Sequence, residues 1–161
     1  MPDMPKPQKE HEWLQRLTGE WEAEARCFMD PNGPPSVNTG IERVRALGGF
    51  WIISEVESDS AENPYANLST TGFDPTKGKY ISTWIDTMTS YLWKSEGTLN
   101  EAGTILTMEA EGICPLNPGR LTRTRDVTEL KGADLKVMTS SMLGEDGNWN
   151  VGMVVTARRK S

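Results

Sequence analysis

The chain has 161 residues, which is the size of one ordinary domain. Of these residues 36% are hydrophobic and 25% are charged, a composition that allows the chain to form a core. No apolar run approaches the roughly 18 residues of a transmembrane helix. The net charge of -6 argues against nucleic-acid and anionic-membrane partners, because both attract a basic surface. We therefore expect a single domain, 1–161, with six Trp among its aromatic residues.

Residues 1–7 are polar and rich in proline, which predicts a flexible N-terminus without the apolar core of a secretory signal. We therefore expect a cytoplasmic protein in which Cys27 and Cys114 stay reduced. Two cysteines and the single His11 are too few for a zinc site without carboxylates, and no metal or cofactor is expected. The Trp13, Leu14 and Leu17 spacing predicts a short helix over 8–18.

After Gly19 the pattern changes to alternation: Trp21, Ala23 and Ala25 alternate with acidic residues, which is typical of a strand with one dry face. Turn signals recur about every ten residues, as in an all-β meander. The segments between them predict strands at 19–28, 37–47, 50–58, 66–73, 79–87, 90–99, 104–112, 120–130, 134–143 and 148–158. We expect an antiparallel up-and-down β-barrel of about ten strands over 19–158, because closure removes exposed strand edges.

The sequence Gly19-Glu20-Trp21 after a short helix resembles the Gly-x-Trp signature of lipocalins, in which the Trp closes one end of the barrel. The resemblance implies that an Arg near the last strand packs over this Trp. Both Arg158 and Arg159 lie in the matching region.

A longer set of motifs covers nearly the whole chain: Glu10-His11-Glu12-Trp13-Leu14, Gly19-Glu20-Trp21, Leu47-Gly48-Gly49-Phe50-Trp51, Gly72-Phe73-Asp74-Pro75, Trp84-Ile85-Asp86, Arg125-Asp126-Val127 and Leu143-Gly144-Glu145-Asp146-Gly147. Together these motifs resemble the bacterial DUF1579 family, a domain of unknown function. The resemblance implies a lipocalin-like or nitrobindin-like barrel and transfers no catalytic residues. Nitrobindin-type barrels hold haem through a histidine in the C-terminal half, which this chain lacks.

Two neighbouring predicted strands carry aromatic residues at mid-strand, Tyr80 and Trp84 on one and Tyr91 and Trp93 on the other. If both faces point inward, the four side chains form an aromatic wall of a ligand cavity. Ordinary packing of a core is the alternative, and it is favoured for Trp13 and Trp21.

Charged residues also lie within predicted strands. If Arg43 and Arg125 point inward, their guanidinium groups suit the anionic headgroup of a ligand, with Asp126 beside Arg125. If they point outward, they pair with acidic residues such as Glu55 or Glu129 across strands. The alternation alone does not decide, because a one-residue slip of register exchanges the two faces.

These patterns favour a barrel that binds a small apolar or amphipathic molecule through Trp84, Trp93, Tyr80, Tyr91, Arg43, Arg125 and Asp126. No nucleophile with an adjacent base can be assembled, so no catalytic residue is assigned. Two alternatives remain. One is an isomerase or hydrolase with Asp86, Glu55 or Asp126 as a buried carboxylate base. The other is a filled barrel that acts through its surface as a scaffold, with a homodimer left open.

Overall fold

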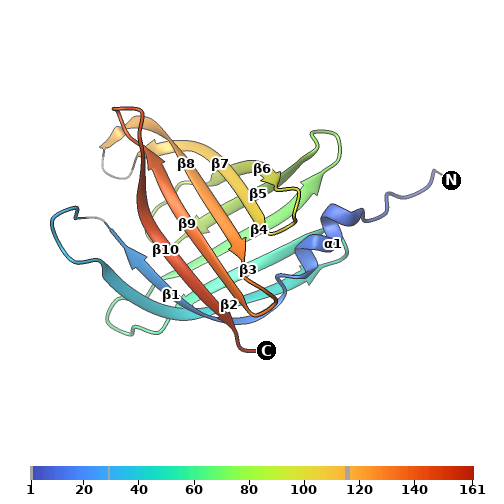
Figure 1. The fold of residues 1–161 in the computed structure, drawn as a ribbon, viewed down its shortest axis with the longest axis horizontal. Helices are drawn as coiled ribbons and strands as arrows, with labels where there is room; N and C mark the ends of the chain where they lie inside the picture. The colour runs from blue at the N-terminus through green and yellow to red at the C-terminus, as the bar shows by residue number, and fades with distance from the viewer. Residues whose placement is uncertain (1, 29, 115–116) are drawn as a thin grey trace.

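The computed structural model describes residues 2–28, 30–114 and 117–161 and shows a closed antiparallel β-barrel with one short helix (Figure 1). The elements in chain order are α1 Lys9–Gln15, β1 Gly19–Cys27, β2 Ser36–Leu47, β3 Trp51–Ser58, β4 Ala66–Asp74, β5 Lys79–Asp86, β6 Trp93–Leu99, β7 Ile105–Cys114, β8 Asn117–Leu130, β9 Leu135–Leu143 and β10 Trp149–Arg159. Each strand pairs with its neighbours in the chain, and β1 pairs with both β2 and β10. The predicted ten-stranded up-and-down barrel is confirmed.

Tight hairpins connect several of the strands. Gly78, between β4 and β5, has a φ of 66°, and its backbone N–H donates to the Asp74 carbonyl at 2.8 Å. Only glycine adopts this left-handed conformation without steric cost, which explains why a turn of this kind ends in glycine.

The inner face of the barrel follows from Trp21, which is 1% exposed. Residues paired directly across antiparallel strands share a face. Trp21 pairs with Glu42 of β2 and Arg159 of β10, so these two residues and every second residue from them along their strands point inward as well. The same register carried from strand to strand assigns the inner face of all ten strands.

Helix α1 lies at one end of the barrel (Figure 1), and we call this the closed end. Leu14 is fully buried there, and the backbone carbonyl of Glu10 accepts a hydrogen bond from the Tyr80 hydroxyl of β5 at 3.1 Å. The helix is shorter than the predicted 8–18, because a turn follows Gln15. Within the described residues, no helix is long and apolar enough to cross a membrane.

Candidate functional site

The closed end is held by side chains that reach from α1 to the strands and hairpins. His11 is 3% exposed: its Nδ1 accepts from the Gln8 backbone N–H at 2.9 Å, and its Nε2 lies 3.1 Å from the Phe73 carbonyl. The acceptor role of Nδ1 places the proton of a neutral ring on Nε2, which then donates to Phe73. The indole of Trp13 donates to the Gly103 carbonyl at 2.8 Å. His11 therefore caps and anchors the helix.

The floor of the interior is built around Trp21. Its indole N–H donates to the Leu17 carbonyl at 3.0 Å, and the guanidinium of Arg159 lies 4.2 Å from the ring centroid. Of the two arginines that the lipocalin resemblance left open, Arg159 is therefore the one that packs over the Trp. The ammonium of Lys136 lies 4.5 Å from the centroid of the same ring.

Lys136 also forms an ion pair with Glu42 inside the barrel, and the two side chains are 12% and 19% exposed. The partners lie on β9 and β2, with β10 and β1 between them. The inner residues of those two strands beside Lys136 are Ala157 and Ala23, which are small enough for the lysine stem to pass over. The pair neutralises both charges within the barrel, where an unpaired charge would be costly.

Above this floor the inner positions are mostly small, and their residues are only half-buried. They are Ala25, Ser54, Ser69, Thr71, Ser82, Ser95, Ala110, Thr124 and Ser140. Inner residues nearer α1 are large and buried, for example Ile52 at 5% and Leu106 at 6% exposure. The inner side chains at mid-depth are therefore smaller and less buried than those near α1, and we call this part of the interior the hollow.

The hollow has two unlike walls. Hydroxyl side chains line β3 to β6, and there the Thr71 and Ser82 hydroxyls lie 3.3 Å apart. Thioethers line β7, β9 and β10 on the other side, with Met108, Met138, Met142 and Met153. Such a pair of walls suits a molecule with one polar and one apolar side.

Asp126 of β8 points into the hollow, because its cross-strand partners Met108 and Ser140 both face inward. Its Oδ1 atom is buried and has no hydrogen-bond partner among the described residues. Burial raises the pKa of the Asp126 carboxyl, and the Ser140 hydroxyl partly opposes the rise by hydrogen bonding. An unpartnered buried carboxylate is costly, so this atom marks a place where a partner is missing.

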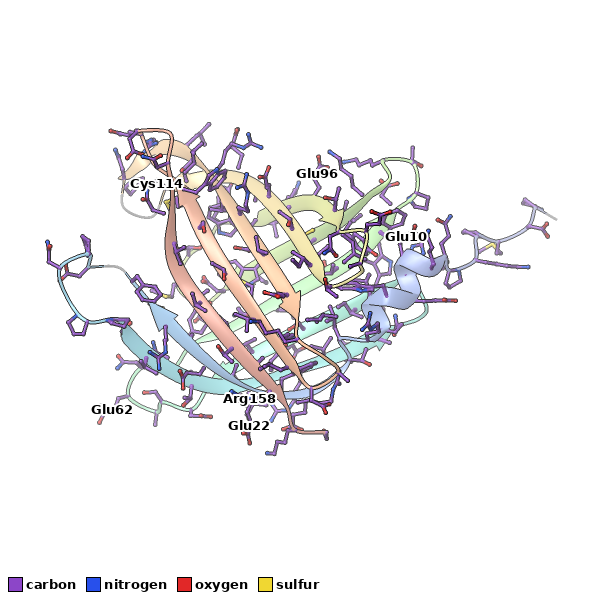
Figure 2. All side chains as sticks on the ribbon, in the orientation of Figure 1. Glu10, Glu22, Glu62, Glu96, Cys114 and Arg158 are labelled. Carbon is purple, nitrogen blue, oxygen red and sulfur yellow. The ribbon has the colours of Figure 1, made fainter. Side chains whose placement is uncertain are left out.

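The end of the barrel opposite α1, which we call the mouth, is bordered by Trp84 and Trp93. These two residues are direct cross-strand partners on the inner face of β5 and β6. A β-carbon on Gly112 would overlap the Trp93 ring, so the indole lies directly against the glycine backbone. Tyr91 packs edge-on against Trp93 with 4.9 Å between ring centroids. Figure 2 shows Cys114, at the end of β7, far from Glu10 on α1.

A second polar group lies at the mouth, where the Tyr65 hydroxyl donates to Asp86 Oδ2 at 3.3 Å and accepts from Asn67 at 3.3 Å. Burial raises the pKa of Tyr65 to about 12, and the nearby charge of Asp86 adds to the rise. The hydrogen bond from Asn67 acts in the opposite direction. Asp86 Oδ1 accepts from the backbone N–H groups of Met88 and Thr89. Both carboxylate oxygens of Asp86 are thus occupied.

The structure separates the predicted site residues. Trp84, Trp93 and Asp126 face the hollow, and Tyr91 supports the Trp93 ring. Tyr80 faces inward but is 2% exposed and engaged with α1, so its hydroxyl belongs to the closed end. Burial raises the pKa of this hydroxyl to about 12.

The two predicted arginines point outward, which corrects the idea of a guanidinium clamp inside the barrel. Arg43 lies 3.8 Å from Glu57 with 59% of its side chain exposed. Arg125 pairs with Glu109 at 2.7 Å and lies 4.0 Å from the ring centroid of Trp149. Both take the cross-strand role that was the alternative, because their positions alternate with the inner Glu42 and Asp126.

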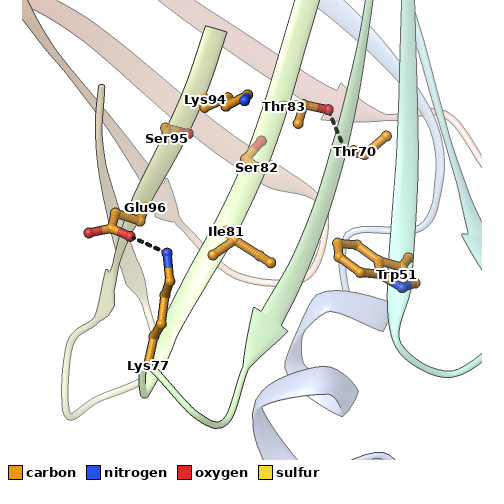
Figure 3. A pocket seen from close by; sticks show the side chains of 9 residues that line it. All are labelled: Trp51, Thr70, Lys77, Ile81, Ser82, Thr83, Lys94, Ser95 and Glu96. Atoms are coloured by element: carbon orange, nitrogen blue, oxygen red, sulfur yellow. Dashed lines mark hydrogen bonds and ion pairs between the residues drawn. The ribbon is translucent and has the colours of Figure 1, made fainter. Parts of the chain in front are cut away.

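Two recesses on the outer surface are weaker candidates. The first, of about 330 Å³, lies over β3 to β6 beside Trp51 and Ile81 (Figure 3). Four of its polar side chains contact each other in pairs, since Thr70 and Thr83 lie 2.6 Å apart and Lys77 pairs with Glu96 at 3.3 Å (Figure 3). The second, of about 690 Å³, is bordered by Phe28, Pro31, Trp149, Asn150, Val151 and Val154. Within the described residues, neither contains an unpartnered buried polar group like Asp126.

The sequence interpretation missed Lys136, Glu42 and the Tyr65 group. The sequence did contain a signal for Lys136. It lies at every-second-residue spacing with Met138, Ser140 and Met142, on a strand face that is otherwise uncharged. A single lysine in such a row indicates a buried cation that needs an acidic partner.

A family model described as a protein of unknown function, DUF1579, matches residues 6–159. The chain belongs to the DUF1579 family. No curated protein matches this DUF1579 chain. Among solved structures, it is similar to Rv2717c from M. tuberculosis, with a TM-score of 0.71, 12% identity, and coverage of 97% of this chain and 100% of the other. It is also similar to the S-type phycobiliprotein lyase CPES from Guillardia theta, with a TM-score of 0.60, 10% identity, and coverage of 98% and 99%. At these identities the likeness establishes the shared barrel fold.

Proposed function

We propose that the protein binds a small amphipathic molecule inside the barrel. The observation that carries the proposal is the ring of small, half-buried side chains at mid-depth, such as Ser82, Ser95, Ala110 and Ser140. The interior of an eight-stranded barrel is either filled by side chains or holds one small ligand, and it widens as strands are added. A ten-stranded barrel with small inner residues therefore leaves room for a ligand, which disfavours the filled scaffold.

The walls define what kind of molecule fits. The hydroxyls of β3 to β6 offer hydrogen bonds, whereas the thioethers of β7, β9 and β10 offer an adaptable apolar surface. Trp84 and Trp93 add aromatic surface at the mouth, where a ligand enters. The lyase from Guillardia theta shows that a barrel of this shape occurs in a protein named for action on phycobiliproteins, and it supports no particular ligand here.

Filling the hollow is the direct test. Ala110→Phe places a large ring at mid-depth on the inner face, and Thr98→Phe places the same ring on the exposed outer face of the neighbouring strand. Tryptophan fluorescence and thermal shift are measured against a panel of amphipathic amines, acids, alcohols and aromatic probes. We expect Ala110→Phe to weaken binding by about tenfold or more, since one buried group contributes about 1.4 kcal/mol or more, whereas Thr98→Phe keeps wild-type affinity.

Two results would overturn the proposal. One is a wild-type protein in which no member of the panel moves either signal. The other is a ligand that binds Ala110→Phe as tightly as wild type, provided that circular dichroism shows the variant to be folded.

A second candidate function is acid–base catalysis on the bound molecule by Asp126. Of the three carboxylates predicted for this role, Glu55 is exposed on the outer face and Asp86 is engaged by Tyr65 and backbone N–H groups. Asp126 alone of the three combines an unpartnered oxygen with a raised pKa, as a general acid or base requires. Turnover of a bound ligand that is lost in Asp126→Asn, with binding retained, is the expected sign of this activity.

A further inference from the structure

The unpartnered oxygen of Asp126 says what the bound molecule must supply. This carboxyl lies between a thioether, Met108, and a hydroxyl, Ser140, on the apolar side of the hollow. Its Oδ1 has no hydrogen-bond donor among the described residues. A buried carboxylate with one unpartnered oxygen and no counter-ion is costly, and a ligand that brings a hydrogen-bond donor and a positive charge removes that cost.

The acidic side chains that face the interior are not fully balanced by basic side chains. The inner acidic residues are Glu42, Asp86 and Asp126, and the inner basic residues are Lys136 and Arg159, with Arg120 on the same face of β8 near the mouth. Lys136 is paired with Glu42, and Arg159 donates to the backbone carbonyls of Thr18, Arg16 and Ala133 beneath Trp21. Arg120, near the mouth end of β8, is taken up by Glu145 at 3.5 Å. Among the described residues, the interior therefore contains two further carboxyl groups, Asp86 and Asp126, and no free basic side chain to balance them.

The register also gives the depth of Asp126. Trp93 lies over Gly112, which pairs with Thr122, and Thr122 is four residues from Asp126 along β8. At roughly 3.3 Å per residue this separates the carboxyl from the mouth by about 13 Å. An elongated molecule with its polar group at Asp126 thus reaches the indoles of Trp84 and Trp93 with its other end.

Building on the proposed binding function, we infer that the ligand is an amine whose protonated head pairs with Asp126 and whose apolar or aromatic body extends toward Trp84 and Trp93. The ammonium donates to Oδ1 of Asp126 and to the Ser140 hydroxyl, which has a free lone pair. A carboxylate head would meet uncompensated negative charge. An alcohol head would satisfy one hydrogen bond but leave the charge of Asp126 unbalanced.

The test compares three head groups on the same body. Binding of 4-phenylbutylamine, 4-phenylbutan-1-ol and 4-phenylbutanoate is measured by calorimetry near neutral pH, together with a decyl series of the same three heads. The proteins are wild type, Asp126→Asn, and Glu111→Gln, which neutralises an exposed carboxylate at the outer surface of β7. We expect wild type and Glu111→Gln to bind the amine about tenfold or more tighter than the alcohol, with the carboxylate weakest. Asp126→Asn should bind amine and alcohol alike.

The outcomes separate this inference from the proposed function. If the alcohol or the carboxylate binds wild type as tightly as the amine, or if Asp126→Asn keeps the preference for the amine, the inference is overturned and binding in the hollow stands. If neither series binds while other members of the amphipathic panel do, the inference is again overturned. If nothing in the panel binds, both fail. Retained binding of the alcohol by Asp126→Asn shows that the variant is folded.

Discussion

At the closed end of the barrel the inner side chains are large, buried and partnered, whereas from mid-depth to the mouth they are small or only half-buried. Trp21 at the closed end is 1% exposed, donates its N–H to the Leu17 carbonyl and has the cations of Lys136 and Arg159 against its ring. Asp126 at mid-depth has a buried oxygen with no partner among the described residues. In the closed half of the barrel the polar side chains are paired and stabilise the fold, whereas in the open half Asp126 is left unpaired and is available to a ligand. Such a division is expected, because binding sites often reduce the stability of a protein.

Removing Trp21 should destabilise the closed end of the barrel. Trp21→Ala deletes a buried indole, its hydrogen bond and its contacts with two cations, and we expect a loss of about 3–5 kcal/mol in the free energy of unfolding. Trp51→Ala is the matched control, because Trp51 is 38% exposed on the outer surface and should cost about 1 kcal/mol. Urea denaturation followed by circular dichroism measures both. Equal losses for the two tryptophans would contradict the contrast between core and surface.

The ion pair on the floor gives the next largest effect. Lys136→Met leaves the Glu42 carboxylate inside the barrel without its cation, and we expect a loss of roughly 2–4 kcal/mol. In the double variant Glu42→Leu with Lys136→Met, no charge remains unpaired, and most of the lost stability should return. The coupling energy from the four proteins checks this expectation. Simple additivity of the two single changes would show that the pair contributes nothing.

Asp126→Asn should raise the free energy of unfolding, because it removes a buried carboxyl that has an unpaired oxygen. Burial raises the pKa of Asp126 above its ordinary value, so the protonated form stabilises the fold and ionisation at higher pH removes that stability. The amide that replaces the carboxyl stays neutral at every pH. We expect the variant to be more stable than wild type near pH 7 by about 1–2 kcal/mol, a rise of roughly 2–8 °C in Tm.

The difference should shrink as the pH falls through the raised pKa of Asp126 in the folded protein, and it should be lost below the ordinary aspartate pKa of 3.8, where the carboxyl is neutral in both the folded and the unfolded state. Thermal melts of both proteins between acidic and neutral pH provide the measurement. A variant that is less stable than wild type at neutral pH, or a difference that does not change with pH, would show that the carboxyl already has a partner.

The same contrast explains which features the sequence predicted. Alternation through Trp21, Ala23 and Ala25 and the regular turns were sufficient for the barrel, because they depend only on local pattern. The direction of Arg125 was not predictable in this way. In β8 arginine alternates with threonine, so both faces are polar, and only the pairing of Asp126 with Met108 identifies the inner one.

Long-range pairs were beyond the sequence for a related reason. Lys136 and Glu42 lie on strands that are not neighbours, and only closure of the barrel brings them together. Tyr80 shows the converse, since its position on the inner face was expected, but the helix that occupies its hydroxyl comes from the distant N-terminus. The local sequence pattern therefore predicts which face of a strand a residue lies on, whereas the closed barrel determines which side chains it contacts.

The smallest effect on stability is expected at the mouth, where Gly112→Ala tests how firmly the aromatic residues are held. The added β-carbon would overlap the Trp93 ring and fall 2.8 Å from the Tyr91 ring, both of them outer ends of side chains at the open end of the barrel. Since these rings can move toward the hollow, we expect a loss below about 1 kcal/mol in the free energy of unfolding together with greater quenching of tryptophan fluorescence by acrylamide. Gly152→Ala is the control, because its nearest neighbour is 4.0 Å away, and it should leave the quenching unchanged. A loss for Gly112→Ala as large as that for Trp21→Ala would mean that the mouth is packed as firmly as the closed end, and the difference between the two halves of the barrel would disappear.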